Sequence, residues 1–245
     1  MSATEQGAWT VDEPVARRHL LVVLPHPDDE SFSSAGTMAM HADAGVPVTF
    51  LCGTYGDMGR NMGRPFFANR ETLRDVREQE AREACRILGA ELAFMGLRDK
   101  TVEFEDPDEL AARIEAVIRE RAADLVITFY PGKAVHPDHD ALGEATVRAV
   151  RRLPETERPT LWTVAVGPPE QLEEDLGTPD VRVDIRPYAD RKMAALEAHA
   201  TQTKAMFERF EAGSDQDEHL RRRLEEGRRT ESFYRLDPDR SDPPG

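Results

Sequence analysis

Short apolar runs alternate with longer amphipathic stretches along most of the chain. Runs rich in Val, Ile, Leu and Phe predict strands at residues 19–24, 46–51, 91–95, 124–129, 160–166 and 181–185. Apolar positions at helical spacing predict helices at residues 33–43, 71–88, 108–121, 140–152 and 189–211. Because strands that alternate with helices form βαβ units, we expect an α/β fold with a mostly parallel sheet flanked by helices.

No internal repeat and no Pro/Gly-rich linker divides the chain, so we expect a single domain over residues 18–236. Residues 1–17 are polar and are expected to be flexible, and residues 237–245 have the composition of a disordered tail. Residues 213–235 are dense in Arg and Glu. A solvated helix is favoured there over an oligomer contact.

The charge balance excludes several classes of protein. The chain has 245 residues, with 32 Lys and Arg against 47 Asp and Glu, and a formal net charge of −15. This acidity argues against a nucleic-acid partner, which needs a basic surface. No apolar run approaches the ~20 residues of a membrane helix, and no apolar segment of a secretory signal opens the sequence. Cys52 and Cys85 form no CxxC motif, and both are expected to be buried, which fits a cytoplasmic protein.

Two histidine-rich pentapeptides lie at the ends of predicted strands, where open α/β sheets bind their ligands. The first is His26-Pro27-Asp28-Asp29-Glu30, and the second is His136-Pro137-Asp138-His139-Asp140. Each alone is compatible with a capped turn before a helix, since Asp and Pro are common at helix starts. The presence of both motifs, each at a strand end, favours a metal site. Glu30 is expected to be an acid in the first turn of a helix, or a partner of a ligand histidine.

Imidazole nitrogen and carboxylate oxygen are zinc ligands, and a catalytic zinc takes three of them and leaves one position for water. His26 and Asp29 are three residues apart at a strand-to-helix turn, so both side chains can face one point. His139 can supply the third ligand from the neighbouring strand end. Asp28, which points elsewhere than Asp29, is a candidate general base, and His136 is a candidate donor to a developing oxyanion. The same ligand set also suits Fe²⁺ or Co²⁺.

The two motifs together resemble the zinc-dependent PIG-L or LmbE-like de-N-acetylase superfamily, and the resemblance covers nearly the whole chain. Four further segments resemble one branch, the bacillithiol biosynthesis deacetylases: residues 56–63 (GDMGRNMG), 67–73 (FANRETL), 98–101 (RDKT) and 128–132 (TFYPG). Enzymes of that branch remove acetate from N-acetylglucosaminyl-malate and leave glucosaminyl-malate. The resemblance therefore implies a metal-dependent amidohydrolase with a single-domain Rossmann-like fold.

The resemblance also implies roles for individual residues. His26, Asp29 and His139 correspond to the zinc ligands, Asp28 to the general base, and His136 to the residue that polarises or protonates during the tetrahedral step. An RxxEA pattern begins at Arg77, which implies that this arginine contacts substrate. An LGxxD-like pattern ends at Asp99, which implies that this carboxylate binds sugar hydroxyls. Some relatives place a tyrosine where this chain has Ala134, so a tyrosine role at that position is absent.

A glycine-rich loop at residues 57–74 holds four arginines and two acids, a local charge of +2 in an acidic chain. The planar guanidinium pairs with a carboxylate through two parallel hydrogen bonds, and malate brings two carboxylates. Arg60 or Arg64, with Lys133 from another loop, is expected to bind them. Arg70 and Arg74 are interpreted as helix-surface arginines paired with local acids. The same loop carries four apolar residues that predict either a lid or core packing: Met58, Met62, Phe66 and Phe67.

Several alternatives stay open from the sequence. A thiol S-conjugate amidase or a general N-acetylglucosamine deacetylase would use the same fold and zinc chemistry. A two-metal phosphoesterase needs a bridging carboxylate and more ligands, and a non-catalytic binding module has no need of a base beside the metal. A homo-oligomer is plausible for an acidic enzyme of this size. The remaining histidines are expected to be structural or solvated: His19, His41, His199 and His219.

Overall fold

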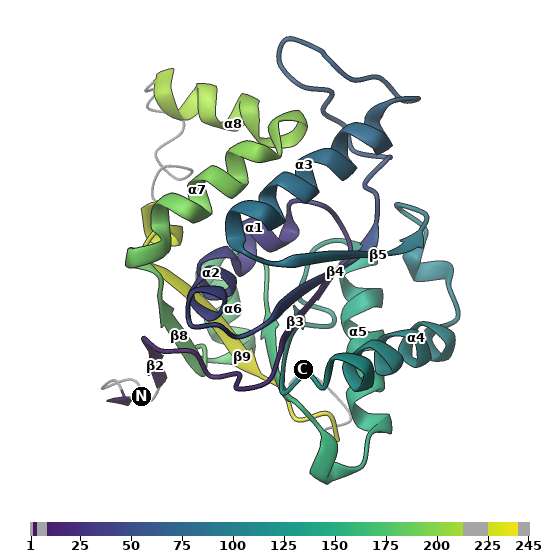
Figure 1. The fold of residues 1–245 in the computed structure, drawn as a ribbon, viewed down its shortest axis with the longest axis vertical. Helices are drawn as coiled ribbons and strands as arrows, with labels where there is room; N and C mark the ends of the chain where they lie inside the picture. The colour runs from purple at the N-terminus through teal and green to yellow at the C-terminus, as the bar shows by residue number, and fades with distance from the viewer. Residues whose placement is uncertain (1, 4–8, 213–224, 240–245) are drawn as a thin grey trace.

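The computed structural model describes residues 2–3, 9–212 and 225–239. Within these residues a single nine-stranded sheet runs in the order β1-β2-β8-β9-β7-β6-β3-β4-β5, with helices on both faces (Figure 1). The strands are β1 (Ser2–Ala3), β2 (Trp9–Val11), β3 (Leu20–Leu24), β4 (Val48–Thr54), β5 (Glu91–Leu97), β6 (Leu125–Phe129), β7 (Thr160–Val164), β8 (Val181–Asp184) and β9 (Thr230–Arg235). The expected α/β fold is confirmed.

The described helices flank this sheet, and none of them is long and apolar enough to cross a membrane. They are α1 (Asp29–Ser33), α2 (Ala35–Asp43), α3 (Leu73–Leu88), α4 (Pro107–Arg121), α5 (Pro137–Arg152), α6 (Pro169–Leu176), α7 (Ala189–Ala198) and α8 (Ala200–Ala212). Short 3₁₀ turns are η1 (Val102–Phe104), η2 (Glu155–Glu157) and η3 (Arg186–Tyr188).

Strands β5, β4, β3, β6 and β7 pair in parallel and form the centre of the molecule. Every residue of β3 is buried, as expected for a parallel strand that is covered on both faces. Leu20, Val22 and Leu24 join a core with α2, α3 and α7, whereas Leu21 and Val23 join a second core with α4 and α5. Figure 1 shows these two helix layers on opposite sides of the sheet.

All six predicted strands are present, but several predicted helices have different bounds. The helix expected at 33–43 is two helices, α1 and α2, and the one expected at 189–211 is broken at His199 into α7 and α8. Helix α5 begins at Pro137 rather than at residue 140, because His136 accepts a hydrogen bond from the Asp138 amide and acts as the N-cap. Helix α6 has no counterpart among the predictions.

The two segments expected outside the sheet contribute strands to it. In the segment expected to be flexible, β2 pairs in parallel with β8, and Val11 is buried. The segment expected to be a solvated helix ends in β9, which lies between β7 and β8 and is antiparallel to both. Phe233 stacks on Trp162 with ring centroids 5.2 Å apart. Residues 213–224, and residues 240–245 of the expected tail, lie outside the described residues.

The carboxylate of Glu231 in β9 is buried because donors surround it. Composition alone does not reveal these partners. Glu231 is 3% exposed and accepts hydrogen bonds from the Gly36 and Thr37 amides at 2.9 and 2.8 Å. Lys192 of α7 lies 2.7 Å from the same carboxylate. A buried carboxylate with this many donors is tolerated inside a protein. Both cysteines are buried and free, as expected.

Candidate active site

The two histidine motifs meet because the strands that precede them are neighbours. Strands β3 and β6 pair in parallel, with Leu20 opposite Leu125, so the loops after them leave the same edge of the sheet. His26 Nδ1 lies 3.1 Å from His139 Nε2, although 113 residues separate them. Both motifs open onto a cavity of about 310 Å³, whose lining is His26, Asp28, Asp29, Met58, Gly59, Arg60, Arg77, Asp99, Lys100, His136, His139 and Gln202.

Three side chains converge as a metal site would require. Besides the His26–His139 approach, Asp29 lies 3.4 Å from His26 Nδ1 and 3.5 Å from His139 Nε2. One ligand atom from each residue lies within 4.8 Å of the others. His139 Nδ1 lies 3.1 Å from the Ala134 carbonyl oxygen, which can only accept, so the ring proton is on Nδ1 and Nε2 is left with its lone pair. Phe129 stacks on the same ring with centroids 4.1 Å apart.

His26 is oriented from behind by two carboxylates. Its Nε2 lies 3.2 Å from Asp138 and 3.2 Å from Asp99, so this nitrogen carries the proton and Nδ1 faces Asp29 and His139. Ligand histidines in metal sites are oriented by such acceptors. Burial alone would lower the pKa of His26, but hydrogen bonds to Asp138, Asp29 and Asp99 raise it well above its usual value. The same negative surroundings favour a divalent cation.

Asp138 lies inside the second motif, but its position in the sequence predicted no role for it. It is fully buried and also accepts hydrogen bonds from the Lys100 and Val102 amides, at 2.7 and 3.1 Å. A second group of potential ligands joins Asp138 to His26 and His136. Because the Asp138 oxygens are already occupied by backbone donors, the group that contains Asp29 and His139 is better suited to hold an ion.

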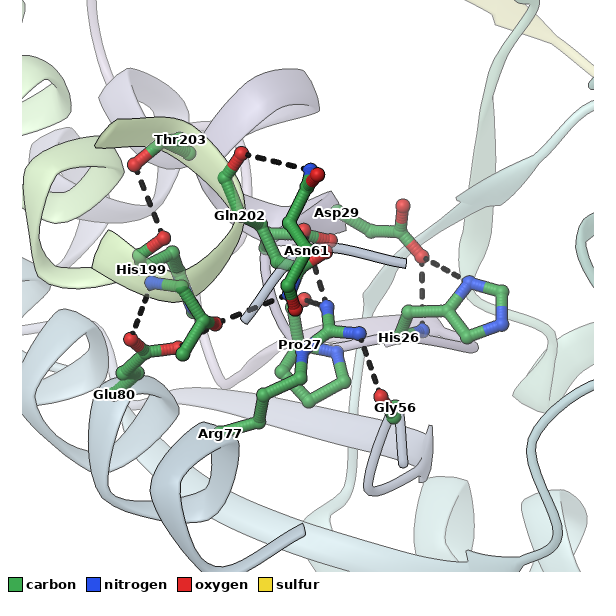
Figure 2. A network of polar contacts seen from close by, with 12 residues as sticks. His26, Pro27, Asp29, Gly56, Asn61, Arg77, Glu80, His199, Gln202 and Thr203 are labelled. Carbon is green, nitrogen blue, oxygen red and sulfur yellow. Dashed lines mark hydrogen bonds and ion pairs between the residues drawn. The ribbon is translucent and has the colours of Figure 1, made fainter. Parts of the chain in front are cut away.

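Asp28 lies beside this group in a strained conformation. Its φ of 107° and ψ of −28° fall in the left-handed region, which costs a non-glycine residue about 1–3 kcal/mol. Arg77 lies 3.1 Å from its carboxylate, and the same guanidinium donates to the carbonyl oxygens of Pro27 and Gly56 (Figure 2). Burial raises the pKa of Asp28 to about 6, with Arg77 opposing and Asp29 reinforcing the shift. A pKa near neutrality is suited to a general base.

Position 56 requires glycine for a steric reason. Its φ is +64°, and a Cβ there would collide with the Arg77 guanidinium. The arginine is 3% exposed, so it supports the loop rather than projecting into solvent. Among the described residues Arg77 Nε has no hydrogen-bond partner.

His136 caps α5 and lines the cavity at the same time. Its Nδ1 accepts the Asp138 amide at 3.1 Å, so a neutral ring carries its proton on Nε2, as a hydrogen-bond donor. The preceding residue, Val135, has a φ of 65°. Together with Asp28 and Lys100, it places three of the four left-handed non-glycine residues in the described chain at this site. Such strain concentrates where geometry serves function.

The family model described as PIG-L, GlcNAc-PI de-N-acetylase, matches residues 21–150, which is more than half of the chain. The chain belongs to the PIG-L family. PIG-L deacetylases are metal-dependent, and the matched region contains both histidine motifs. The probable N-acetyl-alpha-D-glucosaminyl L-malate deacetylase 2 of Bacillus cereus is 51% identical over 192 residues, which cover 78% of this chain and 86% of that protein.

Solved structures show the same fold. N,N'-diacetylchitobiose deacetylase from Pyrococcus horikoshii matches with a TM-score of 0.68 and 21% identity, over 91% of this chain and 85% of that one. GalB, the 4-carboxy-2-hydroxymuconate hydratase from Pseudomonas putida KT2440, matches with a TM-score of 0.69 and 21% identity, over 92% and 99%. Because a deacetylase and a hydratase share it, the fold alone does not define the reaction.

The residues expected to bind substrate in this PIG-L protein divide into two groups. Arg60, Arg77 and Asp99 line the cavity. Arg64 and Lys133 do not belong to its lining and are paired elsewhere: Arg64 lies 2.8 Å from Glu208, and Lys133 lies 2.8 Å from Asp175. Spacing along the chain could not reveal these pairings, because both acids come from distant segments.

The arginine loop is held by its own contacts. Arg70 donates to the Gly59 carbonyl oxygen at 2.7 Å, and Arg74 lies 3.9 Å from the centre of the Tyr55 ring. Among the described residues neither arginine forms the ion pair with a local acid that was expected. Phe66 is 85% exposed. This residue is therefore not part of a core beneath the loop.

Proposed function

We propose that this chain is a zinc-dependent deacetylase that hydrolyses N-acetylglucosaminyl-malate to acetate and glucosaminyl-malate in bacillithiol biosynthesis. One observation carries the proposal: His26, Asp29 and His139 converge with Asp28 beside them, on one cavity wall. The Bacillus cereus relative, named for this activity, supports the choice of substrate. The free, buried cysteines fit a reducing compartment, so we place the activity in the cytoplasm.

We infer that the metal is held by His26 Nδ1, the Asp29 carboxylate and His139 Nε2. The residues fit the ion: each imidazole gives its proton to a protein acceptor on the far side, and the set of two nitrogens and one carboxylate is a zinc set. A zinc ion bound there lowers the pKa of water and polarises a carbonyl group. Fe²⁺ and Co²⁺ suit the same donors.

The protein's own groups then move the protons. Asp28 accepts a proton from the water that attacks the acetamide carbon, and Arg77 holds the carboxylate in place. His136 donates a hydrogen bond from Nε2 to the carbonyl oxygen as negative charge develops there. When the C–N bond breaks, the leaving amine takes the proton that Asp28 has accepted from the water. The products are acetate and the free amine of the sugar.

Two cations at the cavity are free to meet the malate carboxylates. Arg60 and Lys100 are among the residues that line the cavity, and neither side chain has an acidic partner among the described residues. We therefore infer that Arg60 and Lys100 bind the malate, in place of Arg64 and Lys133. Asp99, which faces the same cavity, is proposed to accept hydrogen bonds from sugar hydroxyls, and Arg77 stays a proposed substrate contact.

The alternatives are less well supported. A general N-acetylglucosamine deacetylase acts on a neutral sugar, which offers no carboxylate to Arg60 and Lys100, and a thiol S-conjugate amidase is distinguished by a comparison of substrates. For a two-metal phosphoesterase, the two potential ligand groups in the described part of the chain share His26 and lack a bridging carboxylate. A homo-oligomer stays a prediction that sedimentation would test.

The decisive experiment measures release of primary amine from N-acetylglucosaminyl-malate and from N-acetylglucosamine at equal concentration, with and without a chelator. We expect chelator-sensitive release that strongly favours the malate glycoside. Equal release from both sugars would contradict malate recognition, and release that persists after metal removal would contradict the metal chemistry.

Single alanine variants then test whether Arg60 and Lys100, rather than Arg64, bind the malate. Arg60→Ala and Lys100→Ala should each raise KM for the malate glycoside about 10-fold or more, since a charge-assisted hydrogen bond contributes ~1.5–3 kcal/mol. Arg64→Ala is the matched control, because Arg64 is paired with Glu208, and its KM should not change. A larger effect of Arg64→Ala would reverse the assignment.

A further inference from the structure

We propose that His199, at the corner between α7 and α8, is a positioning residue for Asp28 and acts through Glu30. The inference rests on the proposed function only in taking Asp28 as the general base. His199 was expected to be structural or solvated, and Glu30 was expected to be an acid in a first helical turn. The structure places both side chains in one buried relay that ends at the backbone of Asp28.

The relay consists of two short hydrogen bonds. His199 Nε2 lies 2.7 Å from Glu30 Oε1, across 169 residues of sequence. The other oxygen of the same carboxylate, Glu30 Oε2, accepts the Asp28 amide at 3.0 Å. His199 and Glu30 are both fully buried. Water is therefore not available to replace either bond. If the His199 bond is lost, Glu30 Oε1 keeps the Ser31 hydroxyl, 2.6 Å away, as its donor among the described residues.

Asp28 needs such support because its own conformation is unfavourable. Its φ of 107° is one that L-residues rarely adopt, and its side chain does not cap helix α1. The Glu30 carboxylate holds the amide on one side of the residue, while Arg77 holds the side-chain carboxylate on the other. Both contacts are needed to define where the carboxylate faces the cavity.

Within the described residues, the His199 imidazole has one hydrogen-bond partner, Glu30. Its Nδ1 is buried and has no hydrogen-bond partner in the described part of the chain. Its carbonyl oxygen accepts from the Gln202 amide at 2.9 Å and the Thr203 amide at 3.0 Å, which starts helix α8. The backbone of His199 thus builds the corner, and the side chain serves Glu30 alone.

The same corner also contacts helix α3, which carries Arg77. Thr201 donates from its amide and hydroxyl to Glu80 at 2.7 and 2.6 Å. Glu80 and Arg77 are three residues apart on α3 and so lie on one face of that helix. Gln202 donates to the Asn61 carbonyl oxygen at 3.1 Å and lines the cavity. The corner therefore contacts Glu30 directly, and it contacts the helix that carries Arg77 through Glu80.

Two conservative variants test the relay without removing a polar group. In His199→Gln, the amide nitrogen can occupy the place of Nε2 and donate to Glu30. In His199→Asn, the shorter amide falls at the place of Nδ1, where there is nothing to bond. We expect His199→Asn and His199→Ala to lower kcat about 10- to 100-fold with KM and metal content unchanged. His199→Gln should keep most of the rate.

The matched control is His41→Ala, which deletes another fully buried imidazole that contacts Thr37, Val15 and Ala16 but no residue of the cavity. It should lower the melting temperature and leave kcat unchanged. Equal kcat for His199→Gln and His199→Asn, or an unchanged kcat in His199→Ala, would overturn the relay.

Hydrogen exchange of the peptide that contains Asp28 tests the relay without substrate. The Asp28 amide should exchange faster in His199→Asn and His199→Ala than in the wild type, and at the wild-type rate in His199→Gln and His41→Ala. An unchanged rate in all variants would overturn the relay. If the wild type releases no amine, the proposed function fails, while the exchange pattern still decides the relay.

Discussion

The two histidine motifs follow adjacent parallel strands, yet they are held in different ways. The second motif is built by its own helix start: His136 caps α5 and accepts the Asp138 amide. Asp140 accepts the amides of Gly132 and Ala134 at 2.8 and 3.3 Å, within the same loop. These contacts lie within eight residues of one another. The geometry around His139 is therefore largely local.

The first motif depends on distant segments. Helix α1 has no side-chain cap, and Asp28 keeps its left-handed conformation through Arg77 on α3 and through Glu30, which pairs with His199. The comparison teaches that Asp28, the proposed base, is held by tertiary contacts, while His139, a proposed ligand, is held mainly by its own loop and helix. Substitutions far from the cavity should therefore lower turnover more than they weaken metal binding.

The largest expected loss of rate comes from replacing His139, a proposed metal ligand in the second motif. His139→Ala should lose the metal and lower kcat on the order of 10³-fold or more, because metal catalysis contributes several kcal/mol and each 1.36 kcal/mol is a factor of ten. Elemental analysis of the purified variant, together with amine release, checks both. Full metal content in this variant would show that His139 is not a ligand.

A smaller loss of rate is expected from replacing Asp28, the proposed base in the first motif. Asp28→Asn should lower kcat by ~10²–10⁴-fold, the range of general acid–base catalysis, and should keep the metal. The measurement is kcat on the malate glycoside beside metal content. If this variant lost its metal, the separation between ligand and base would be wrong. A rate near that of the wild type would remove Asp28 from the mechanism.

The smallest of these effects is a loss of metal affinity on replacing Asp138, which contacts both motifs. Asp138 belongs to the second motif but orients His26 of the first. Asp138→Asn should raise the metal dissociation constant by ~10–100-fold, as for other outer partners of ligand histidines. Titration of metal-free protein measures it, with Asp106→Asn, at the N-cap of α4, as a matched control. Equal affinity of the two variants would contradict the role of Asp138.

Much of this molecule follows from patterns within short stretches of chain. Fully apolar runs such as 20–24 can only be satisfied by burial on both faces, so the parallel strands are predictable, and so is the edge at which their loops gather. His26, Asp29 and His139 were expected as ligands for that reason, and the structure brings them together, although their binding of a metal stays a proposal.

Strand β9 was missed because its neighbours in the sequence are charged, whereas its burial depends on partners far away. Phe233 packs on Trp162, and Glu231 is neutralised by Lys192, neither of which is close in sequence. The same reason explains Arg64 and Lys133, which distant acids hold outside the cavity lining.

Local sequence thus defines which residue types stand at the sheet edge, because strand and helix periodicity act over a few residues. Which of them faces the cavity is decided by contacts between segments. The Lys100 side chain has no acidic partner in the part of the chain that the structure describes, and His199 reaches Glu30 across 169 residues. The spacing of residues along the chain contains no information about either, because a buried hydrogen bond depends on the position of its partner in space.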